Sequence, residues 1–277
     1  MSRREMQPNL PAEGLLQAAG DDAEPAVRGW GGGEVALLSR PAPFKTSGNE
    51  DAALVLPLRG EGLLLAVADG CGGMPAGAEA ARLALAALQR AAGENESTEH
   101  TSALLAGFDA ANQAVLDLRL GAGATLTAVL IEGAEVRIFY AGDSPAFIVG
   151  QRGALRYTAQ PHSPTGFGVE AGFLSEREAM THDDRSLVLN ILGSAEMFVH
   201  VSQPVQLRPR DSVLLASDGL SDNLITEQIV DCIRVGSASA AVARLATTVR
   251  ERMHDEASGH PDDLTLLLYR PLAHRGG

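Results

Sequence analysis

The chain has 277 residues, with 22 Lys and Arg against 35 Asp and Glu, so its formal net charge is -13. Nonspecific nucleic-acid binding and anionic-membrane binding both need a basic surface, and this balance argues against both. No apolar run approaches the ~20 residues of a membrane-spanning helix, and no apolar signal-peptide core follows the basic start. The two cysteines lack metal-ligand spacing. We therefore expect a cytoplasmic protein that binds neither nucleic acid nor membrane.

The first part of the chain is predicted to contain a tail, three strands and a helix pair. Residues 1–33 are rich in Gly, Pro and acidic residues without sustained periodicity, which predicts a flexible N-terminal tail. Residues 34–273 are predicted to form one domain, beginning with strands at 34–39, 52–58 and 62–69. Two amphipathic helices follow, because apolar residues such as Ala81, Leu85 and Leu88 recur at helical spacing.

The second part is mostly β-rich. From residue 123, apolar segments broken by Gly-containing turns predict a meander of antiparallel strands. Residues 161–195 contain many polar, Gly and Pro positions, and we expect a flap-like insertion that lies over a site. Later segments are predicted as strands near 199–207, 212–216 and 263–269, and as helices near 226–235 and 239–253.

Acidic residues gather at the ends of the predicted strands. Three apolar strands end in an Asp beside a Gly, at Asp69, Asp143 and Asp218. A single such pair is usually a turn, but three in one chain favour a shared site. Oxygen ligands without neighbouring His or Cys suit Mg²⁺ or Mn²⁺, and two such ions can supply a hydroxide for phosphoester hydrolysis. The candidate carboxylates are Glu50, Asp51, Asp69, Asp143, Asp218, Asp262 and Asp263.

The ordered motifs resemble a known family. The matching segments are NED at 49–51, VADGCGGMPAGAEAA, GATLTAVL, AGDS, EAGFLSEREA, ILGS, LLASDGLSDNL and DDLTLLL, across roughly residues 35–270. Together they are similar to the metal-dependent protein Ser/Thr phosphatases of type 2C, the PPM phosphatases. The resemblance implies an α+β fold, a four-layer αββα sandwich of two antiparallel sheets flanked by helix pairs. It also implies a phosphoSer/phosphoThr phosphatase that uses in-line attack by a metal-bridging hydroxide.

The resemblance also implies roles for individual residues, with two Mn²⁺ or Mg²⁺ ions and a weaker third position. It implies that Asp69 bridges both ions. Glu50 and the Gly70 carbonyl would bind one ion, and Asp218 and Asp262 the other. Asp143 with Asp218 would form the third position, and Asp51 would orient metal-bound water. Taken singly, Glu50 and Asp51 read as solvated loop charges and Asp143 as a turn residue.

Three positions depart from the family pattern. The family usually has an arginine shortly before the NED motif to grip the substrate phosphate, where this chain has Lys45, either a phosphate-binding point charge or a solvated loop residue. Cys71 stands where many relatives have His or Met, and we interpret it as a small loop side chain. In the last motif Asp262 aligns as the ligand, with Asp263 as a competitor.

Two further readings of function stay open beside the enzyme. A phosphatase-like regulatory module would bind a phosphoprotein without turnover, which the altered phosphate-binding loop motivates. A phosphatase acting on an anti-anti-sigma-type regulator would share the chemistry and differ only in partner. In the main reading the partner is a phosphorylated protein, such as the substrate of a Ser/Thr kinase.

Overall fold

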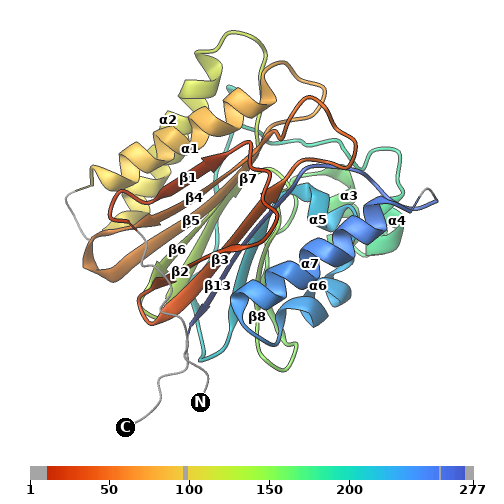
Figure 1. The fold of residues 1–277 in the computed structure, drawn as a ribbon. Coiled ribbons are helices and arrows are strands. Elements are labelled where there is room, and N and C mark those ends of the chain that lie inside the picture. Colours follow the sequence, from red (N-terminus) through yellow and green to blue (C-terminus); the bar gives the residue numbers. More distant parts are fainter. Residues whose placement is uncertain (1–10, 96–98, 256, 272–277) are drawn as a thin grey trace.

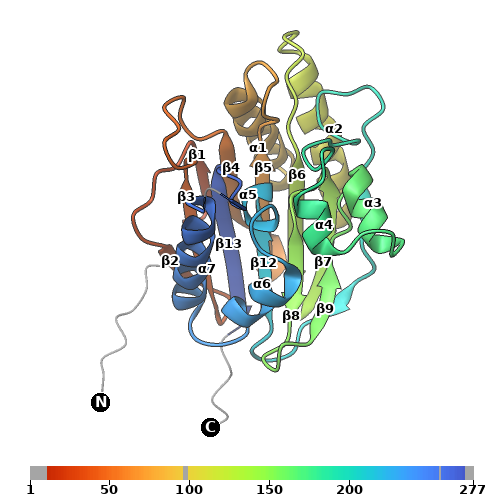
Figure 2. The same ribbon diagram turned by 90° about the vertical axis from the view of Figure 1, so that its right-hand side faces the viewer.

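The computed structural model describes residues 11–95, 99–255 and 257–271. Two β-sheets pack face to face, and helices cover both outer faces (Figures 1 and 2). This arrangement confirms the predicted αββα sandwich. The layers follow from the sequence, because strands that are apolar on both faces must be covered on both faces.

The first sheet has the strand order β1-β4-β5-β6-β7-β10, with β11 also paired to β7. All its pairings are antiparallel. Its central strands are almost wholly buried, as the apolar runs predict. The strands are β1 Leu15–Ala18, β4 Asp51–Pro57, β5 Gly62–Asp69, β6 Leu126–Glu132, β7 Glu135–Ala141, β10 His200–Val201 and β11 Val205–Gln206.

The second sheet has the order β2-β3-β13-β12-β8-β9, again antiparallel throughout. Its inner face and that of the first sheet enclose a core that includes Leu37, Leu65 and Tyr140. The strands are β2 Ala26–Trp30, β3 Gly33–Arg40, β8 Ala146–Val149, β9 Leu155–Thr158, β12 Ser212–Ala216 and β13 Leu264–Pro271.

Helices close the two outer faces, each with an apolar layer of its own. Helices α1 and α2 cover the first sheet, and the predicted stripe of Ala81, Leu85 and Leu88 is buried there. Helices α6 and α7 cover the second sheet. The helices are α1 Gly77–Gly93, α2 His100–Leu116, α3 Pro164–Glu170, α4 Glu176–Met180, α5 Asp218–Ser221, α6 Thr226–Ile233 and α7 Ala238–Met253, with a 3₁₀ turn η1 at Arg59–Glu61.

The prediction of a flexible tail over residues 1–33 is wrong where this segment forms strands β1 and β2. Strand β1 pairs with β4 and strand β2 with β3, so this segment adds one edge strand to each sheet. Both strands are half-buried, and Trp30 packs against the core between the sheets. Their pattern is weak because edge strands take most of their stability from the neighbour with which they pair. Residues 1–10 lie outside the described part of the chain.

The predicted meander from residue 123 is also corrected. Strands β6 and β7 pair in the first sheet, but β8 pairs with β12 in the second. The chain therefore changes sheet between β7 and β8, at residues 142–145. It makes the same change between β3 and β4, at residues 41–50. Both crossings carry predicted site residues, so a change of sheet brings acidic side chains to the end of the sandwich.

Residues 161–195 hold the short helices α3 and α4, which lie together beside α5 and α6 (Figure 2). The flap-like role that we expect for this segment remains a prediction. No helix in the described ranges is both long and apolar enough to cross a membrane.

Candidate metal centre

The site begins where two neighbouring strands of the first sheet meet in register. Asp51 opens β4, Asp69 closes β5, and the antiparallel register places the two residues opposite each other. Ala52 through Leu56 are buried, as are Leu63 through Ala68. A buried strand pair therefore holds two carboxylates side by side at the end of the sandwich.

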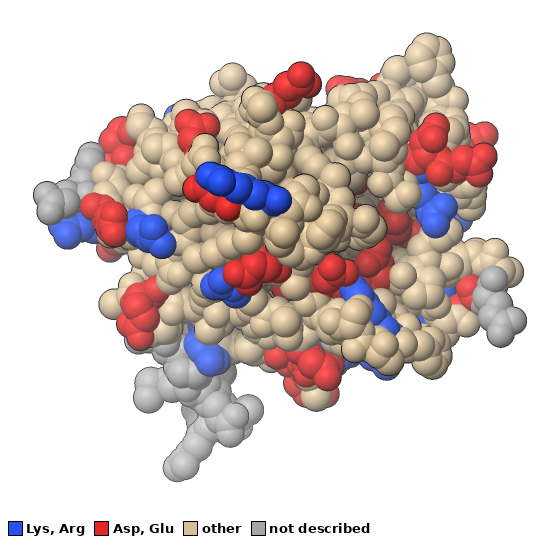
Figure 3. All heavy atoms as spheres, turned by 90° about the horizontal axis from the view of Figure 1, so that it is seen from above, with Lys and Arg blue, Asp and Glu red and all other residues tan. Residues whose placement is uncertain are grey.

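The other predicted carboxylates reach the same place from the second sheet and its crossings. Asp218 follows β12, Asp262 precedes β13, and Asp143 lies in the crossing from β7 to β8. Asp218 repels Asp69, Asp143 and Asp262 electrostatically, so the four groups form one cluster. Seen from above, acidic side chains gather in a recess of the surface (Figure 3). The structure thus brings together residues that lie up to about two hundred positions apart.

This crowding changes the acidity of the cluster. Burial and the charge of Asp218 raise the pKa of the Asp143 carboxyl to about 8 and that of Asp262 to about 7. Burial and repulsion from Asp218 raise the pKa of Asp69 well above its usual value. Buried like charges favour the protonated form unless a cation compensates them. The cluster is therefore poised to exchange protons for positive ions near neutral pH.

Asp51 lies deeper than its neighbours, with 1% of its surface exposed. The Ser217 hydroxyl donates a hydrogen bond to Asp51 Oδ2 at 2.7 Å and itself accepts one from the Thr265 N–H at 2.9 Å. Burial raises the pKa of Asp51 to about 8, against the hydrogen bonds from Ser217 and Thr265 that lower it. Ser217 therefore joins the first sheet's carboxylate to the second sheet's backbone.

Glu50 and the Gly70 carbonyl converge beside the start of α1. A Cβ atom built on Gly77 would stand 2.8 Å from Glu50 Oε1 and 3.2 Å from the Gly70 carbonyl oxygen. A Cβ on Gly70 would stand 2.3 Å from the Gly77 carbonyl carbon. Gly70 needs to be glycine because its backbone meets the backbone of Gly77, and a side chain at Gly77 would press on the Glu50 carboxylate. The result is a pair of oxygen donors at one side of the carboxylate cluster.

The Lys45 ammonium is paired with two carboxylates of the protein and is not a free cation. Its Nζ donates to Glu50 Oε2 at 2.8 Å and to Asp263 Oδ2 at 2.7 Å. Partial burial opposes protonation, but the hydrogen bonds and charges of Asp263 and Glu50 outweigh it and raise the pKa of Lys45. The ammonium is thus held beside the carboxylates, and its predicted role toward phosphate remains a prediction.

Asp262 and Asp263 have different surroundings. Asp263 is buried, and its carboxylate accepts from the Ala42 N–H and the Glu50 N–H, both at 2.7 Å, besides Lys45. Asp262 instead interacts with Asp218 in the cluster. Asp263 therefore fixes the 41–50 loop, whereas Asp262 interacts with other candidate ligands. Which of the two would bind an ion stays a prediction.

A polar network holds Asp143 at the sheet crossing. The Thr125 and Ser144 hydroxyls lie 2.6 Å apart, and Thr125 also accepts from the Asp69 N–H at 3.3 Å. On the other side, Nδ1 of His162 accepts from the Gly142 N–H at 3.2 Å. Burial, with the nearby His200, lowers the pKa of His162 to about 4, so the ring is neutral and serves as an acceptor.

One member of the cluster was missed by the sequence analysis. Asp222 is repelled by Asp218, Asp143 and Asp262, and burial, with those charges, raises its pKa well above the usual range. Asp222 stands four residues after Asp218, and this i, i+4 spacing on a helical turn was the available signal. Cys71 also lies beside the cluster, where burial and the charge of Asp143 raise the pKa of its thiol to about 12. That thiol is protonated at neutral pH.

The donor set fits hard divalent ions. Asp51 Oδ1 and Asp143 Oδ1 are buried, and neither has a hydrogen-bond partner among the described residues. In the same part of the chain, no three His, Cys, Asp or Glu side chains are arranged to hold an ion. Mg²⁺ typically binds one or two carboxylates and keeps several waters, so it needs no closed cage of side chains. The site therefore fits an ion that keeps part of its coordination shell as water.

The fold and this cluster define the class of αββα sandwich proteins that carry an acidic, oxygen-only site at one end. The chain belongs to the protein phosphatase 2C family, whose model matches residues 45–258. This membership confirms the family resemblance predicted from the motifs.

Two relatives illustrate the similarity. The serine/threonine protein phosphatase PstP of Mycobacterium tuberculosis is 30% identical over 212 residues, which cover 74% of this chain and 40% of the relative. The serine/threonine phosphatase stp of Listeria welshimeri is 27% identical over 237 residues, which cover 79% of this chain and 89% of the relative. The chain thus spans about 40% of the length of PstP and most of the length of stp.

A solved structure adds the metal. The catalytic domain of serine threonine protein phosphatase PstP in complex with two manganese ions superposes with a TM-score of 0.70 and 26% identity. The match covers 87% of this chain and 98% of that domain. The similarity supports divalent-metal dependence in this chain, as expected. The assignment of individual ligands remains a prediction.

Proposed function

We propose that this protein is a divalent-metal-dependent phosphatase that hydrolyses phosphoserine and phosphothreonine in proteins. The observation that carries the proposal is the cluster of Asp69, Asp143, Asp218 and Asp262 at the end of the sandwich, in a chain of the protein phosphatase 2C family. Such a cluster is costly without cations. The substrates would be phosphoproteins made by a Ser/Thr kinase, with Mn²⁺ or Mg²⁺ as cofactor.

The residues divide between two ion positions and a weaker third. Asp69 would contact both ions. Glu50 and the Gly70 carbonyl would complete one position, and Asp218 with Asp262 the other. Asp143 and Asp218 would hold the third. When bound, such ions lower the pKa of a coordinated water and neutralise charge on the phosphoryl oxygens.

The surrounding residues would position the reactants. Asp51, held by Ser217, would accept a hydrogen bond from a water near the phosphorus and orient it for in-line attack. Lys45, bonded to Glu50 and Asp263, would fix the Glu50 carboxylate and add positive charge near the phosphate. Localisation in the cytoplasm and the absence of nucleic-acid and membrane partners stay predictions.

The test is hydrolysis of p-nitrophenyl phosphate and of a phosphothreonine peptide, each with Mn²⁺, with Mg²⁺ and with a chelator. We expect activity only with metal, and a loss of about 100-fold or more in Asp218→Asn. Thermal unfolding of the variant serves as the folding control. Metal binding by the wild-type protein without turnover of any phosphoester would overturn the proposal, as would near-normal activity of a folded Asp218→Asn.

A further inference from the structure

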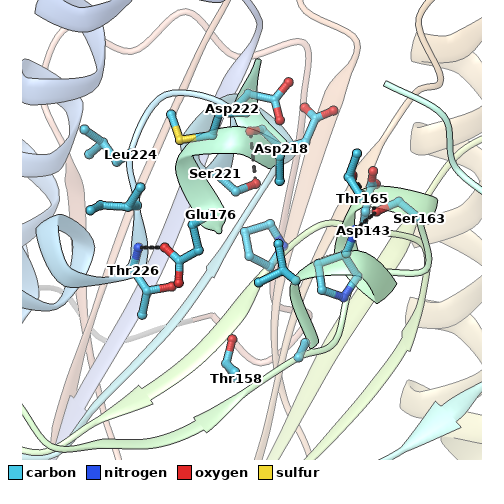
Figure 4. A pocket seen from close by; sticks show the side chains of 18 of the residues that line it. Asp143, Thr158, Ser163, Thr165, Glu176, Asp218, Ser221, Asp222, Leu224 and Thr226 are labelled. Carbon is cyan, nitrogen blue, oxygen red and sulfur yellow. Dashed lines mark hydrogen bonds between the residues drawn. The ribbon is translucent and has the colours of Figure 1, made fainter. Parts of the chain in front are cut away.

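A cleft extends from the acidic cluster, along residues 161–195 of the predicted flap, to strand β9. Its volume is about 190 Å³, and it lies between α3 and α4 on one side and α5 and α6 on the other (Figure 4). Asp143 and Asp218 lie at one end, and Thr158 of β9 lies at the other. Its walls include apolar residues from both sides, among them Phe147, Val169, Ala179, Met180 and Ile229.

Hydrogen bonds across the cleft hold its two sides in place. Glu176 of α4 accepts from the Thr226 N–H at the start of α6, at 2.6 Å (Figure 4). The Gln160 side chain donates to the Gly166 carbonyl at 2.7 Å, which ties the end of β9 to α3. The cleft is therefore preformed, and a ligand would bind without first ordering its walls.

One residue that lines the cleft has an unused donor. Arg185 lines the cleft, and its Nε is buried without a hydrogen-bond partner among the described residues. An unsatisfied buried donor is costly, so an incoming acceptor gains by meeting it. A peptide carbonyl or a phosphate oxygen entering from the acidic end is such an acceptor.

Size and lining select the chemistry of the occupant. An apolar cavity of about 150 Å³ admits benzene, so 190 Å³ accommodates one Leu, Met or Phe side chain. A charged side chain would lose its hydration against the apolar walls, which is unfavourable without a partner. The far part of the cleft therefore suits an apolar group.

We propose that this cleft binds an apolar side chain of the substrate protein, from a residue a few positions away from the phosphorylated Ser or Thr. The inference rests on the proposed function and deepens it, because Asp143 and Asp218 belong both to the metal centre and to the cleft wall. A side chain in the cleft is thereby joined to a phosphate at the centre by only a short stretch of peptide. The cleft thus sets a sequence preference beyond the phosphoresidue.

The test is a positional scan of phosphothreonine peptides in which each flanking position carries Leu, Met, Phe, Ala, Asp or Lys in turn. We expect one position at which an apolar residue raises kcat/KM at least fivefold over Ala. Two variants fill the cleft from opposite sides, Ala179→Phe from α4 and Thr158→Phe from β9. Each variant should reduce the ratio of kcat/KM for the apolar peptide to kcat/KM for the Ala peptide towards one. Ala110→Phe, on the exposed face of α2, is the matched control and should keep the ratio.

The outcomes separate the two proposals. If p-nitrophenyl phosphate is hydrolysed but the peptide profile is flat, the cleft proposal is overturned and the phosphatase stands. If both filling variants have the same unfolding temperature as the wild-type protein and still prefer the apolar peptide, the cleft proposal is again overturned. If neither p-nitrophenyl phosphate nor any peptide is hydrolysed, both proposals fail together.

Discussion

The Lys45 ammonium and the Asp263 carboxylate form a partly buried ion pair at 2.7 Å, in which the Asp263 side chain is 4% exposed and the Lys45 side chain 20%. The same ammonium binds Glu50 at 2.8 Å. The family's arginine would reach for substrate from this part of the chain, whereas this lysine is engaged by the protein itself. The lysine therefore acts first on the 41–50 loop, which carries Glu50.

Lys45→Met should lower the free energy of unfolding by about 1–3 kcal/mol, because Asp263 and Glu50 lose a charged donor. Apparent Mn²⁺ affinity should fall as Glu50 loses its orientation, with a smaller change in KM for p-nitrophenyl phosphate. Lys45→Arg keeps the charge and is the control. A tenfold rise in KM at unchanged Mn²⁺ affinity would instead indicate that Lys45 contacts the phosphate.

Gly70→Ala should destabilise the protein by about 2 kcal/mol or more and weaken metal binding, because the new Cβ would overlap the backbone of Gly77. Gly72→Ala is a matched control two residues away, since a Cβ there meets nothing within 4 Å. Chemical denaturation and isothermal titration with Mn²⁺ measure the two effects. Equal stability of the two variants would contradict the close approach seen here.

Ser217→Ala should cost about 1–3 kcal/mol, because it leaves Asp51 Oδ2 and the Thr265 N–H without their shared partner. We also expect Asp51 to bind its proton more tightly, since a hydrogen bond that lowers its pKa is removed. The measurements are urea unfolding and the pH dependence of hydrolysis, which should shift to higher pH. Ser221→Ala, which loses only a bond to the Asp218 carbonyl, is the comparison.

The stability of the metal-free protein should fall as pH rises from 6.5 to 8.5. Asp51 and Asp143, with pKa values raised to about 8, and Asp262, raised to about 7, hold protons in the folded state that the unfolded state has already released. The free energy of unfolding then decreases by up to about 1.4 kcal/mol per pH unit for each such proton. His162 opposes this trend only at the low end of the range, because the unfolded imidazole, with its ordinary pKa of 6.5, still binds part of a proton there while the folded ring is neutral.

Mn²⁺ should reverse this dependence, because an ion binds the deprotonated carboxylates and its affinity rises with pH. Thermal unfolding at pH 6.5, 7.5 and 8.5, with Mn²⁺ and with a chelator, measures both effects. The increase in unfolding temperature on adding Mn²⁺ should be largest at pH 8.5. A metal-free protein whose stability rises with pH would contradict the assigned carboxyl protonation.

Asp222→Asn tests the cluster member that the sequence analysis missed. Removing its charge should stabilise the metal-free protein at pH 8.5, because Asp222 is repelled by Asp218, Asp143 and Asp262. Mn²⁺ affinity should fall severalfold, since one compensating negative charge is lost. Asp109→Asn on the exposed face of α2 is the control and should leave both quantities unchanged.

Much of the architecture could be predicted because it depends on local pattern. The central strands are apolar on both faces and the outer helices have one apolar stripe, so their positions follow from sequence alone. Asp69 and Asp218 could be named as candidates for the same reason, since Asp69 closes a buried strand and Asp218 stands two residues after one. The order of the motifs identified Glu50, Asp143 and Asp262 as further candidates.

Long-range pairing decided the rest. Strand β1 pairs with β4 and not with the next strand in the sequence, and nothing local indicates that β7 and β8 lie in different sheets. The interaction partners of Lys45 and the different environments of Asp262 and Asp263 depend on side chains brought together from distant segments. The sequence by itself determined which residues are buried and which strand ends carry acids. Only the tertiary structure decided which acids share one recess, because electrostatic repulsion and hydrogen bonding depend on distances in space.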